Sequence, residues 1–561
     1  MEKYLNRAKS KLESKLQDLS LSHQDNSSST PAKSNGPPPI PPKPLTSSPD
    51  RQDNLHPATA TDVLRYRYQH GTNLGTIFCL ERWLYPHLFT GLPEKQSSEL
   101  ACAQHLVKLF GVDGARKKLE EHWANALTDR DLDWLVNVAK VNAIRLPIGH
   151  WTLGPAFCDG TPFANVGDVY ANAWAAVRDL TLRAKSRGVG VLIDLHGIPG
   201  GANGSEHSGT NCGKAEHWGR GCGHLRAKSR QCLEHIAREI AANAAGFGDG
   251  VVGLQVCNEA EWEARGLWEW YDSVVDAVQA IDPTLPVYIS DAWNLDKGVS
   301  YAQRVNAVNV RSRPAPVVVD THHYWCFGDQ NKLKAPEQIA GEARRKLDGV
   351  PQRGGNVLKK GAVAVVVGEW SCVLGEESWK RSRKSRDELV KEFGTAQCQA
   401  HQEKAMGAFF WTYKMQWAPG GEWGLQSVVP RGAHPPPSYL TLSHSTVQSR
   451  LQAALNRRDD LRHGSVSAHA NYWDGASPGT PFEHWRYEKG WETGFDDAAA
   501  FWRHRGEQQG ADGADRIGSV ETWVRKRVVE SGMGGEYVWE FEQGLRKGVG
   551  DFWGAVEGDR A

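Results

Sequence analysis

Eight short apolar segments constrain the fold of this chain more than any other feature of its sequence. Each suits a β-strand that is covered on both faces, and most of the intervals between them carry the apolar spacing of helices. Strands that alternate with helices in this way favour a closed (β/α)8 TIM barrel, an α/β fold, over an open doubly wound sheet. The segments are residues 72–79, 142–148, 190–195, 251–256, 286–290, 316–321, 362–368 and 406–411.

Two of these predicted strands run directly into a glutamate. Residues 251–256 are followed by Asn258 and Glu259, and residues 362–368 by Glu369. The carboxyl ends of barrel strands carry the catalytic groups of TIM-barrel enzymes, so we expect both carboxylates in one cleft. Hydrolysis of a glycosidic bond needs such a pair, because one carboxyl protonates the leaving oxygen while the other attacks the anomeric carbon or activates water.

The composition divides the chain into three regions, and only the middle one carries the strand pattern. We predict a disordered tail over residues 1–58, a TIM-barrel domain over 59–462, and a tryptophan-rich helical appendix over 463–561 that packs on the barrel. An independent carbohydrate-binding module is the alternative for the last region. Such modules are usually β-sandwiches, whereas this segment lacks strand patterning.

The tail contains two recognisable segments. Apolar residues between Leu5 and Leu19 recur at helical steps among lysines, which predicts a short basic amphipathic helix, a type that binds anionic membrane surfaces or partner proteins. The proline-rich run 37–44 favours polyproline II and resembles a ligand for an SH3 domain. A helix without a role and a plain linker are the alternatives.

Charge and cysteine usage restrict the class of protein. The 66 basic and 66 acidic residues balance to a formal net charge of +0, so we expect no nucleic-acid partner. The first residues lack the apolar stretch of a secretory signal, and the ten cysteines show no disulfide spacing. We therefore expect a cytoplasmic protein with mostly reduced cysteines.

No cofactor or metal is expected, because two carboxylates suffice for glycoside hydrolysis. One loop carries Cys212, His217, Cys222 and His224, but their spacing fits no common zinc site. We predict that this loop covers the cleft.

Motifs in the order of a known family run through the middle region. The chain resembles family 5 glycoside hydrolases, in the branch of the fungal exo-β-1,3-glucanases (glucan 1,3-β-glucosidases), over roughly residues 65 to 430. The motifs are residues 71–75 with Glu81, 144–148, 195–200, 258–259, 320–324, 368–370 and 411–414.

The resemblance implies roles for the residues around the two glutamates. Glu259 is expected to be the general acid/base, with a raised pKa, and Glu369 the nucleophile, held ionised by Arg145 and Tyr324. Asn258 is expected to bind the 2-hydroxyl of the sugar. The family's carboxylates stand about 5 Å apart, which implies retention of configuration through a glycosyl-enzyme.

Further residues are expected to bind the sugar. His196 and His322 would line the pocket, Trp411 would stack under the −1 sugar, and Glu81 would bind hydroxyls of the terminal glucose. Phe327 matches an aromatic residue that flanks the +1 subsite.

The loop after the third strand departs from the branch pattern. Ser205 stands where the family has the aromatic partner of Phe327, and His207 stands where it has an asparagine near the −1 sugar. This departure leaves linkage preference and exo action open, while it leaves the two glutamates in place.

We therefore predict a retaining β-glycosidase that hydrolyses β-glucosidic bonds, with β-1,3-glucan oligomers as the first substrate class. A β-glucosidase acting on a glycolipid, such as a steryl glucoside or glucosylceramide, is the alternative among enzymes. A non-catalytic glucan-binding scaffold, recruited through the proline-rich tail, is the alternative from another class.

Overall fold

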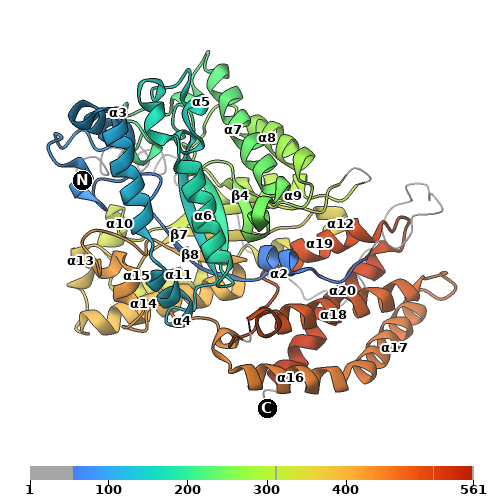
Figure 1. Cartoon of the computed structure of the whole chain (residues 1–561). Coiled ribbons are helices and arrows are strands. Elements are labelled where there is room, and N and C mark those ends of the chain that lie inside the picture. Colours follow the sequence, from blue (N-terminus) through green and yellow to red (C-terminus); the bar gives the residue numbers. More distant parts are fainter. Residues whose placement is uncertain (1–54, 310–311, 510, 559–561) are drawn as a thin grey trace, which may run out of the picture.

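A computed structural model describes residues 55–309, 312–509 and 511–558. Within these residues, eight parallel strands form a closed barrel in the order of the chain, β1 to β8, and helices surround it (Figure 1). The predicted TIM barrel is therefore confirmed. The predicted amphipathic helix and proline-rich run lie outside the described residues.

The strands lie close to their predicted positions, because each apolar segment is buried along its whole length. Residue numbers differ by three or fewer at either end for seven of the eight strands. The strands are β1 Gln69–Asn73, β2 Ala143–Gly149, β3 Gly190–Gly197, β4 Val251–Gln255, β5 Val287–Ser290, β6 Val317–His323, β7 Val365–Trp370 and β8 Gly407–Phe410.

The first strand differs from the prediction of residues 72–79. It begins three residues earlier and ends at Asn73, and Thr76 then turns the chain out of the sheet with a left-handed φ of 68°. His122 Nε2 donates to the Thr76 carbonyl oxygen, 2.9 Å away, and Thr76 Oγ1 accepts from the backbone N–H of Glu81. The run of apolar residues from Ile77 to Leu80 is buried in this loop, which is why it has the pattern of a strand.

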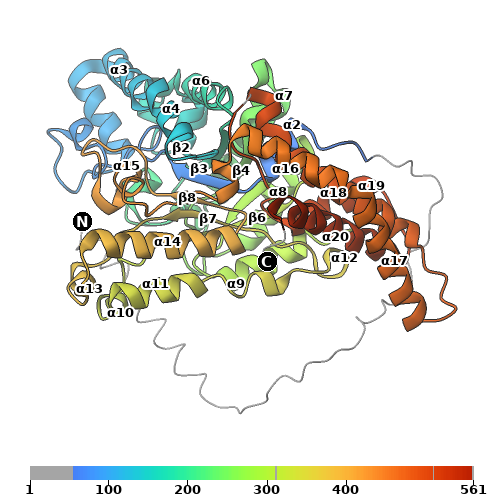
Figure 2. The same ribbon diagram turned by 90° about the horizontal axis from the view of Figure 1, so that it is seen from below.

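The helices cover the outside of the barrel and extend beyond it at the C-terminal end (Figures 1 and 2). The 28-residue α3 is broken at Gly111, which has a φ of 68°. The helices of the barrel part are α2 Ala60–Tyr66, α3 Glu99–Ala126, α4 Asp129–Asn137, α5 Pro155–Cys158, α6 Ala173–Lys185, α7 Gly223–Ala242, α8 Leu267–Ile281, α9 Leu295–Val305, α10 Asp329–Lys332, α11 Pro336–Arg345, α12 Val357–Lys360, α13 Glu376–Trp379, α14 Arg386–Lys404 and α15 Leu425–Val428.

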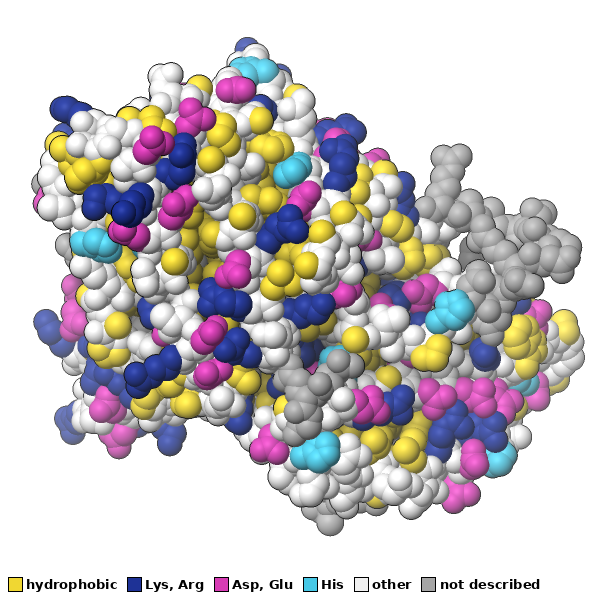
Figure 3. Space-filling view, viewed as in Figure 1, with side chains coloured by type: hydrophobic (Ala, Val, Ile, Leu, Met, Phe, Trp, Pro, Cys, Tyr) yellow, Lys and Arg dark blue, Asp and Glu magenta, His cyan; other side chains and the backbone are white. Residues whose placement is uncertain are grey.

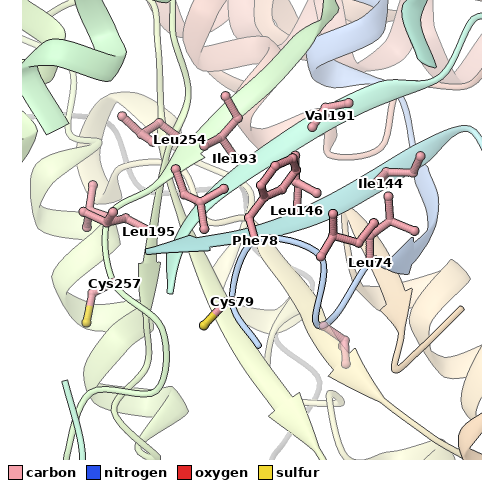
Figure 4. Packing of buried hydrophobic residues seen from close by; sticks show 14 of the residues in the cluster. Leu74, Phe78, Cys79, Ile144, Leu146, Val191, Ile193, Leu195, Leu254 and Cys257 are labelled. Atoms are coloured by element: carbon pink, nitrogen blue, oxygen red, sulfur yellow. The ribbon is translucent and has the colours of Figure 1, made fainter. Parts of the chain in front are cut away.

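Successive residues of the strands face opposite sides of the barrel wall. One set, which includes Ile144 and Leu146, belongs to the large core under the surrounding helices, and Figure 4 shows part of this packing. The other set, which includes Ala143 and Leu192, forms a separate apolar cluster that Leu64 of α2 completes. Arg145 lies two residues beyond Ala143 on the same face, so the polar site described below rests on this apolar layer.

The C-terminal region is helical, as predicted, and has its own core. It comprises α16 His444–Asn456, α17 Arg458–Ala476, α18 His484–Gln509, α19 Val520–Ser531 and α20 Val538–Glu557. In Figures 1 and 2 these helices lie together on one flank of the barrel. Their core also takes in Val63 and Tyr66 of α2, and Val357 and Ala362 from the barrel part.

The surface carries both signs of charge. Figure 3 shows lysine and arginine side chains interspersed with aspartate and glutamate over the barrel and over the C-terminal helices. In the part of the chain that the structure describes, no helix combines the length and the apolar character that crossing a bilayer requires.

Helices α18 and α20 approach so closely that their contact is made of glycines. A Cβ atom at Gly544 would lie 2.0 Å from the Tyr487 carbonyl oxygen, and one at Gly548 would lie 2.1 Å from that of Trp491. Only glycine leaves room for a backbone at this distance.

We expect Gly544→Ala to lower the stability of the helical region by about 1–3 kcal/mol, because the added methyl group overpacks a rigid backbone contact. Urea unfolding followed by tryptophan fluorescence measures the change. Gly550→Ala is the matched control, since Gly550 lies on the same helix with open space around it. Alanine has a higher helix propensity than glycine, so Gly550→Ala should raise the stability by about 0.5–1 kcal/mol. Equal effects of the two substitutions would contradict the packing argument.

Candidate active site

The barrel brings Glu259, Glu369 and His322 together at the carboxyl ends of β4, β7 and β6. His322 Nδ1 lies 2.8 Å from Glu259 Oε1 and 3.5 Å from Glu369 Oε2. One oxygen of each carboxylate and one ring nitrogen lie within 4.8 Å of one another. The two glutamates that the sequence singles out therefore face each other across one imidazole ring.

Arg145 of β2 supports this pair from below. Its guanidinium donates to Glu369 Oε1 at 2.9 Å and to Asn258 Oδ1 at 2.7 Å. It also lies 3.0 Å from Asp194 Oδ2, and Nε donates to Gln255 Oε1 at 2.9 Å. Burial lowers the pKa of Arg145, but the charges of Asp194 and Glu369 outweigh burial and raise it. The arginine is therefore a permanent cation beneath the site.

Glu369 has two donors on its two oxygens. Arg145 donates to Oε1, and the Tyr324 hydroxyl donates to Oε2 at 2.7 Å. Burial raises the pKa of Glu369, and the charges of His322 and Arg145 offset that effect only in part. Both hydrogen bonds favour the ionised carboxylate as acceptor and fix its orientation.

Glu259 differs from the expectation of a raised pKa. Burial raises its pKa, but the hydrogen bond and charge of His322, together with the charges of His207 and His196, outweigh burial and lower it. The backbone of Glu259 has a left-handed φ of 44°, and its carbonyl accepts from Asn203 Nδ2 at 2.9 Å. The spacing of the sequence could not show that three histidines surround this carboxylate.

His322 lies between the Glu259 and Asp320 carboxylates. Its Nδ1 faces Glu259, and its Nε2 lies 3.1 Å from Asp320 Oδ2. A neutral imidazole can donate from only one nitrogen. Burial lowers the pKa of His322, but Glu369 and Asp320 outweigh burial and raise it well above its usual value.

His196 is the second histidine that the sequence placed in the site. Its Nδ1 donates to Asp194 Oδ2 at 2.7 Å, which fixes the ring. Its Nε2 lies 3.2 Å from Asn258 Nδ2 and 3.1 Å from His207 Nδ1. The ring also stacks at 6.3 Å on Trp411, with an interplanar angle of 18°. His196, Asn258 and Trp411 thus form one wall of the site.

Glu81, Trp411 and Phe327 are all linked to one group of aromatic side chains around Trp83 and Trp423. Trp83 Nε1 donates to Glu81 Oε2 at 2.8 Å, and burial raises the pKa of Glu81 to about 7. Trp411 and Trp83 belong to one aromatic cluster. Phe327 contacts Tyr324, with ring centroids 5.6 Å apart, and lies farther along this aromatic wall.

Several residues of the site were not identified from the sequence. Asp194 and Asp320 each lie two residues before a site histidine, and alternation along a strand puts such pairs on one face. That spacing was a usable signal. His207 was noted only as a departure from the family, yet its Nε2 lies 3.4 Å from Glu259 Oε2. Trp423, which packs against Trp83 at 5.5 Å, had no sequence signal.

Comparison with known protein families agrees with this geometry. A model described as Cellulase (glycosyl hydrolase family 5) matches residues 106–416. A second model, the Glucan 1,3-beta-glucosidase 3 C-terminal domain, matches residues 454–556. The two models cover the barrel and the helical region in turn.

Individual glycosyl hydrolases are also similar to this chain. The chain is 33% identical to glucan 1,3-beta-glucosidase 3 of Schizosaccharomyces pombe, covering 86% of this chain and 95% of that protein. It is 30% identical to an uncharacterized glycosyl hydrolase of Saccharomyces cerevisiae, covering 89% and 94%. A rutinosidase structure from Aspergillus niger matches at a TM-score of 0.51 and 20% identity, covering 67% of this chain and 99% of that one, which supports the fold. The chain therefore belongs to glycosyl hydrolase family 5 and is a glycoside hydrolase.

Proposed function

We propose that this protein is a retaining β-glucosidase that hydrolyses β-1,3-linked glucan oligomers by double displacement. The observation that carries the proposal is the placement of one oxygen of Glu259 and one of Glu369 within 4.8 Å of each other. Carboxyl groups about 5–5.5 Å apart are typical of retaining enzymes, whereas inverting enzymes leave about 6.5–9.5 Å for a water molecule. The substrate class is supported by the S. pombe relative, which is named a glucan 1,3-beta-glucosidase.

In the first step Glu369 attacks the anomeric carbon and the glycosidic oxygen takes a proton from Glu259. Arg145 and Tyr324 each hold one oxygen of Glu369, so the carboxylate is oriented before the sugar arrives. The bond from the anomeric carbon to the leaving oxygen breaks as the bond to Glu369 forms. In the second step Glu259 takes a proton from water, which then displaces Glu369.

The proton for the first step is shared within a hydrogen-bonded pair. The hydrogen bond and charge of His322 lower the pKa of Glu259 in spite of its burial. His322 Nδ1 lies 2.8 Å from Glu259 Oε1, so the two groups share one proton, which Glu259 transfers to the leaving oxygen as the glycosidic bond breaks. Proton donation in this protein therefore depends on both groups.

Exo action is supported by the aromatic residues beside Glu81. Trp83 packs against Trp417 at 6.1 Å and against Trp423 at 5.5 Å, and Trp417 Nε1 donates to the Trp83 carbonyl. This cluster stands next to Glu81, the residue that resembles the family's ligand of the terminal glucose. We propose that it closes the non-reducing end of the cleft.

We expect Glu369→Gln to lower kcat by about 10^4-fold or more while leaving the fold and sugar binding intact, because the amide keeps the shape and loses the nucleophile. Release of glucose from laminari-oligosaccharides measures kcat, and titration of tryptophan fluorescence measures binding. Glu377→Gln, an exposed residue in the segment after β7, is the control and should behave as wild type.

Steryl glucoside, assayed in parallel, separates the oligosaccharide proposal from the glycolipid alternative. A wild-type protein that cleaves steryl glucoside but not laminari-oligosaccharides contradicts the proposed substrate. A wild-type protein that cleaves neither, and binds sugar as Glu369→Gln does, is a non-catalytic scaffold.

The first product should keep the β configuration at its anomeric carbon, since two displacements restore it. Proton NMR of the reaction mixture, recorded before mutarotation, distinguishes the anomers. Early accumulation of α-glucose would refute double displacement.

His322→Gln should move the basic limb of the kcat/KM–pH profile toward acid by about one pH unit or more, with some activity kept at low pH. In the wild type, His322 is the last of Glu259, His322 and Glu369 to lose its proton as pH rises, because its pKa is raised. In the variant only the carboxyls can hold that proton, and a carboxyl loses it at lower pH. His323→Gln is the control, because His323 lies on the other face of β6 beside His401. An unchanged basic limb in His322→Gln would show that His322 does not hold the proton.

A further inference from the structure

Three side chains of metal-binding type meet in the C-terminal helices, outside the glycosidase site. His469 lies in α17, His484 is the first residue of α18, and Glu540 lies in the first turn of α20. Glu540 Oε2 lies 3.0 Å from His469 Nε2 and 2.9 Å from His484 Nδ1. We refer to these three residues as the His–His–Glu cluster.

The cluster is shielded from solvent. The Glu540 side chain is 0% exposed and that of His469 is 4% exposed. Tyr487 stacks on the His469 ring at 3.8 Å, and Trp539 lies against the same ring. A buried carboxylate must be compensated by a cation or by several donors.

Part of that compensation is visible in the backbone. Glu540 Oε1 accepts from the Glu483 N–H at 2.9 Å, at the start of α18. This leaves Oε2 directed at both imidazole rings. A single carboxylate oxygen with a ring nitrogen on either side is the arrangement of a metal ligand set.

His484 gives a second, independent indication. Its Nδ1 faces Glu540, and its Nε2 lies 3.1 Å from Asp474 Oδ1. A neutral ring has one N–H and can donate to only one of these carboxylates. If a metal ion binds Nδ1, Nε2–H donates to Asp474, which is the carboxylate–histidine–metal arrangement that orients ligands in metalloproteins.

We propose that His469 Nε2, His484 Nδ1 and Glu540 Oε2 bind one divalent transition metal ion, with Zn²⁺ as the preferred ion. Two imidazoles and a carboxylate suit Zn²⁺. Bonds of about 2.0–2.2 Å at tetrahedral angles separate neighbouring ligand atoms by about 3.3–3.5 Å. The separations of 3.0 Å and 2.9 Å in the cluster are close to that range, so small side-chain shifts accommodate the ion. The fourth position is open to water.

The ion would join three helices that are distant in sequence. It links α17 to the start of α18 and both of them to α20. The cluster therefore has a structural role in the helical region, and hydrolysis in the barrel does not depend on it. This proposal stands apart from the proposed function.

The test measures metal content and thermal stability of the full-length protein. Protein purified without chelator and passed through metal-free buffer should carry about one equivalent of zinc by inductively coupled plasma mass spectrometry. Removal of zinc with a chelator should lower the melting temperature of the protein, and added Zn²⁺ should restore it. Cobalt(II) should bind in place of zinc and give the visible absorption of a tetrahedral site.

Two variants with partly exposed side chains identify the ligands without disturbing the core. His484→Gln should abolish zinc binding, and Asp474→Asn should weaken it by about 10–100-fold, because Asp474 orients the ligand. His463→Gln is the matched control, since His463 is an exposed histidine of the same helix as His469. It should bind zinc as wild type does.

Two results would overturn the proposal. Zinc content below one tenth of an equivalent, with no change on adding Zn²⁺, would leave His484 as a ring that only hydrogen-bonds to Glu540 and Asp474. Zinc that stays bound in His484→Gln and inhibits hydrolysis would place the ion at Glu259, His322 and Glu369, the other group of ligand atoms within 4.8 Å.

Discussion

The buried charge of Arg145 is the interaction on which the rest of the site depends. Its side chain is 0% exposed, and no water can replace a lost partner there. Such a charge is tolerated only when carboxylates and hydrogen-bond acceptors surround it. Asp194 and Glu369 supply the charge, while Asn258 and Gln255 complete the hydrogen bonding. Glu369, the proposed nucleophile, is thus also a structural counter-ion that the barrel holds in place.

The same burial explains why the pKa values of Glu369 and Glu259 differ from those expected for an isolated nucleophile and an isolated general acid. Low solvent access raises the pKa of Glu369, whereas the His322 charge lowers that of Glu259. Glu259, His322 and Glu369 thus form one electrostatically linked group above the apolar layer of the barrel.

The sequence predicts the fold well and places Glu259 and Glu369 at strand ends, because both inferences depend on local patterns. Burial on both faces makes barrel strands apolar, and a glutamate at a strand end is visible without coordinates. The early end of β1 was missed because its loop buries as many apolar residues as a strand. The low pKa of Glu259 was missed because His207 and His322 come from different loops and strands. The His–His–Glu cluster was missed because its members lie on three helices, with no regular spacing.

The seven-residue helix α2 packs into both hydrophobic cores of the protein that are described above. Leu64 completes the apolar floor of the barrel, while Val63 and Tyr66 belong to the core of the C-terminal helices. Neighbouring side chains of one short element thus serve two hydrophobic cores. Neither core can open without exposing the apolar surface that the other shares with this helix. The barrel and the helical region should consequently unfold in a single cooperative transition, as one thermodynamic unit.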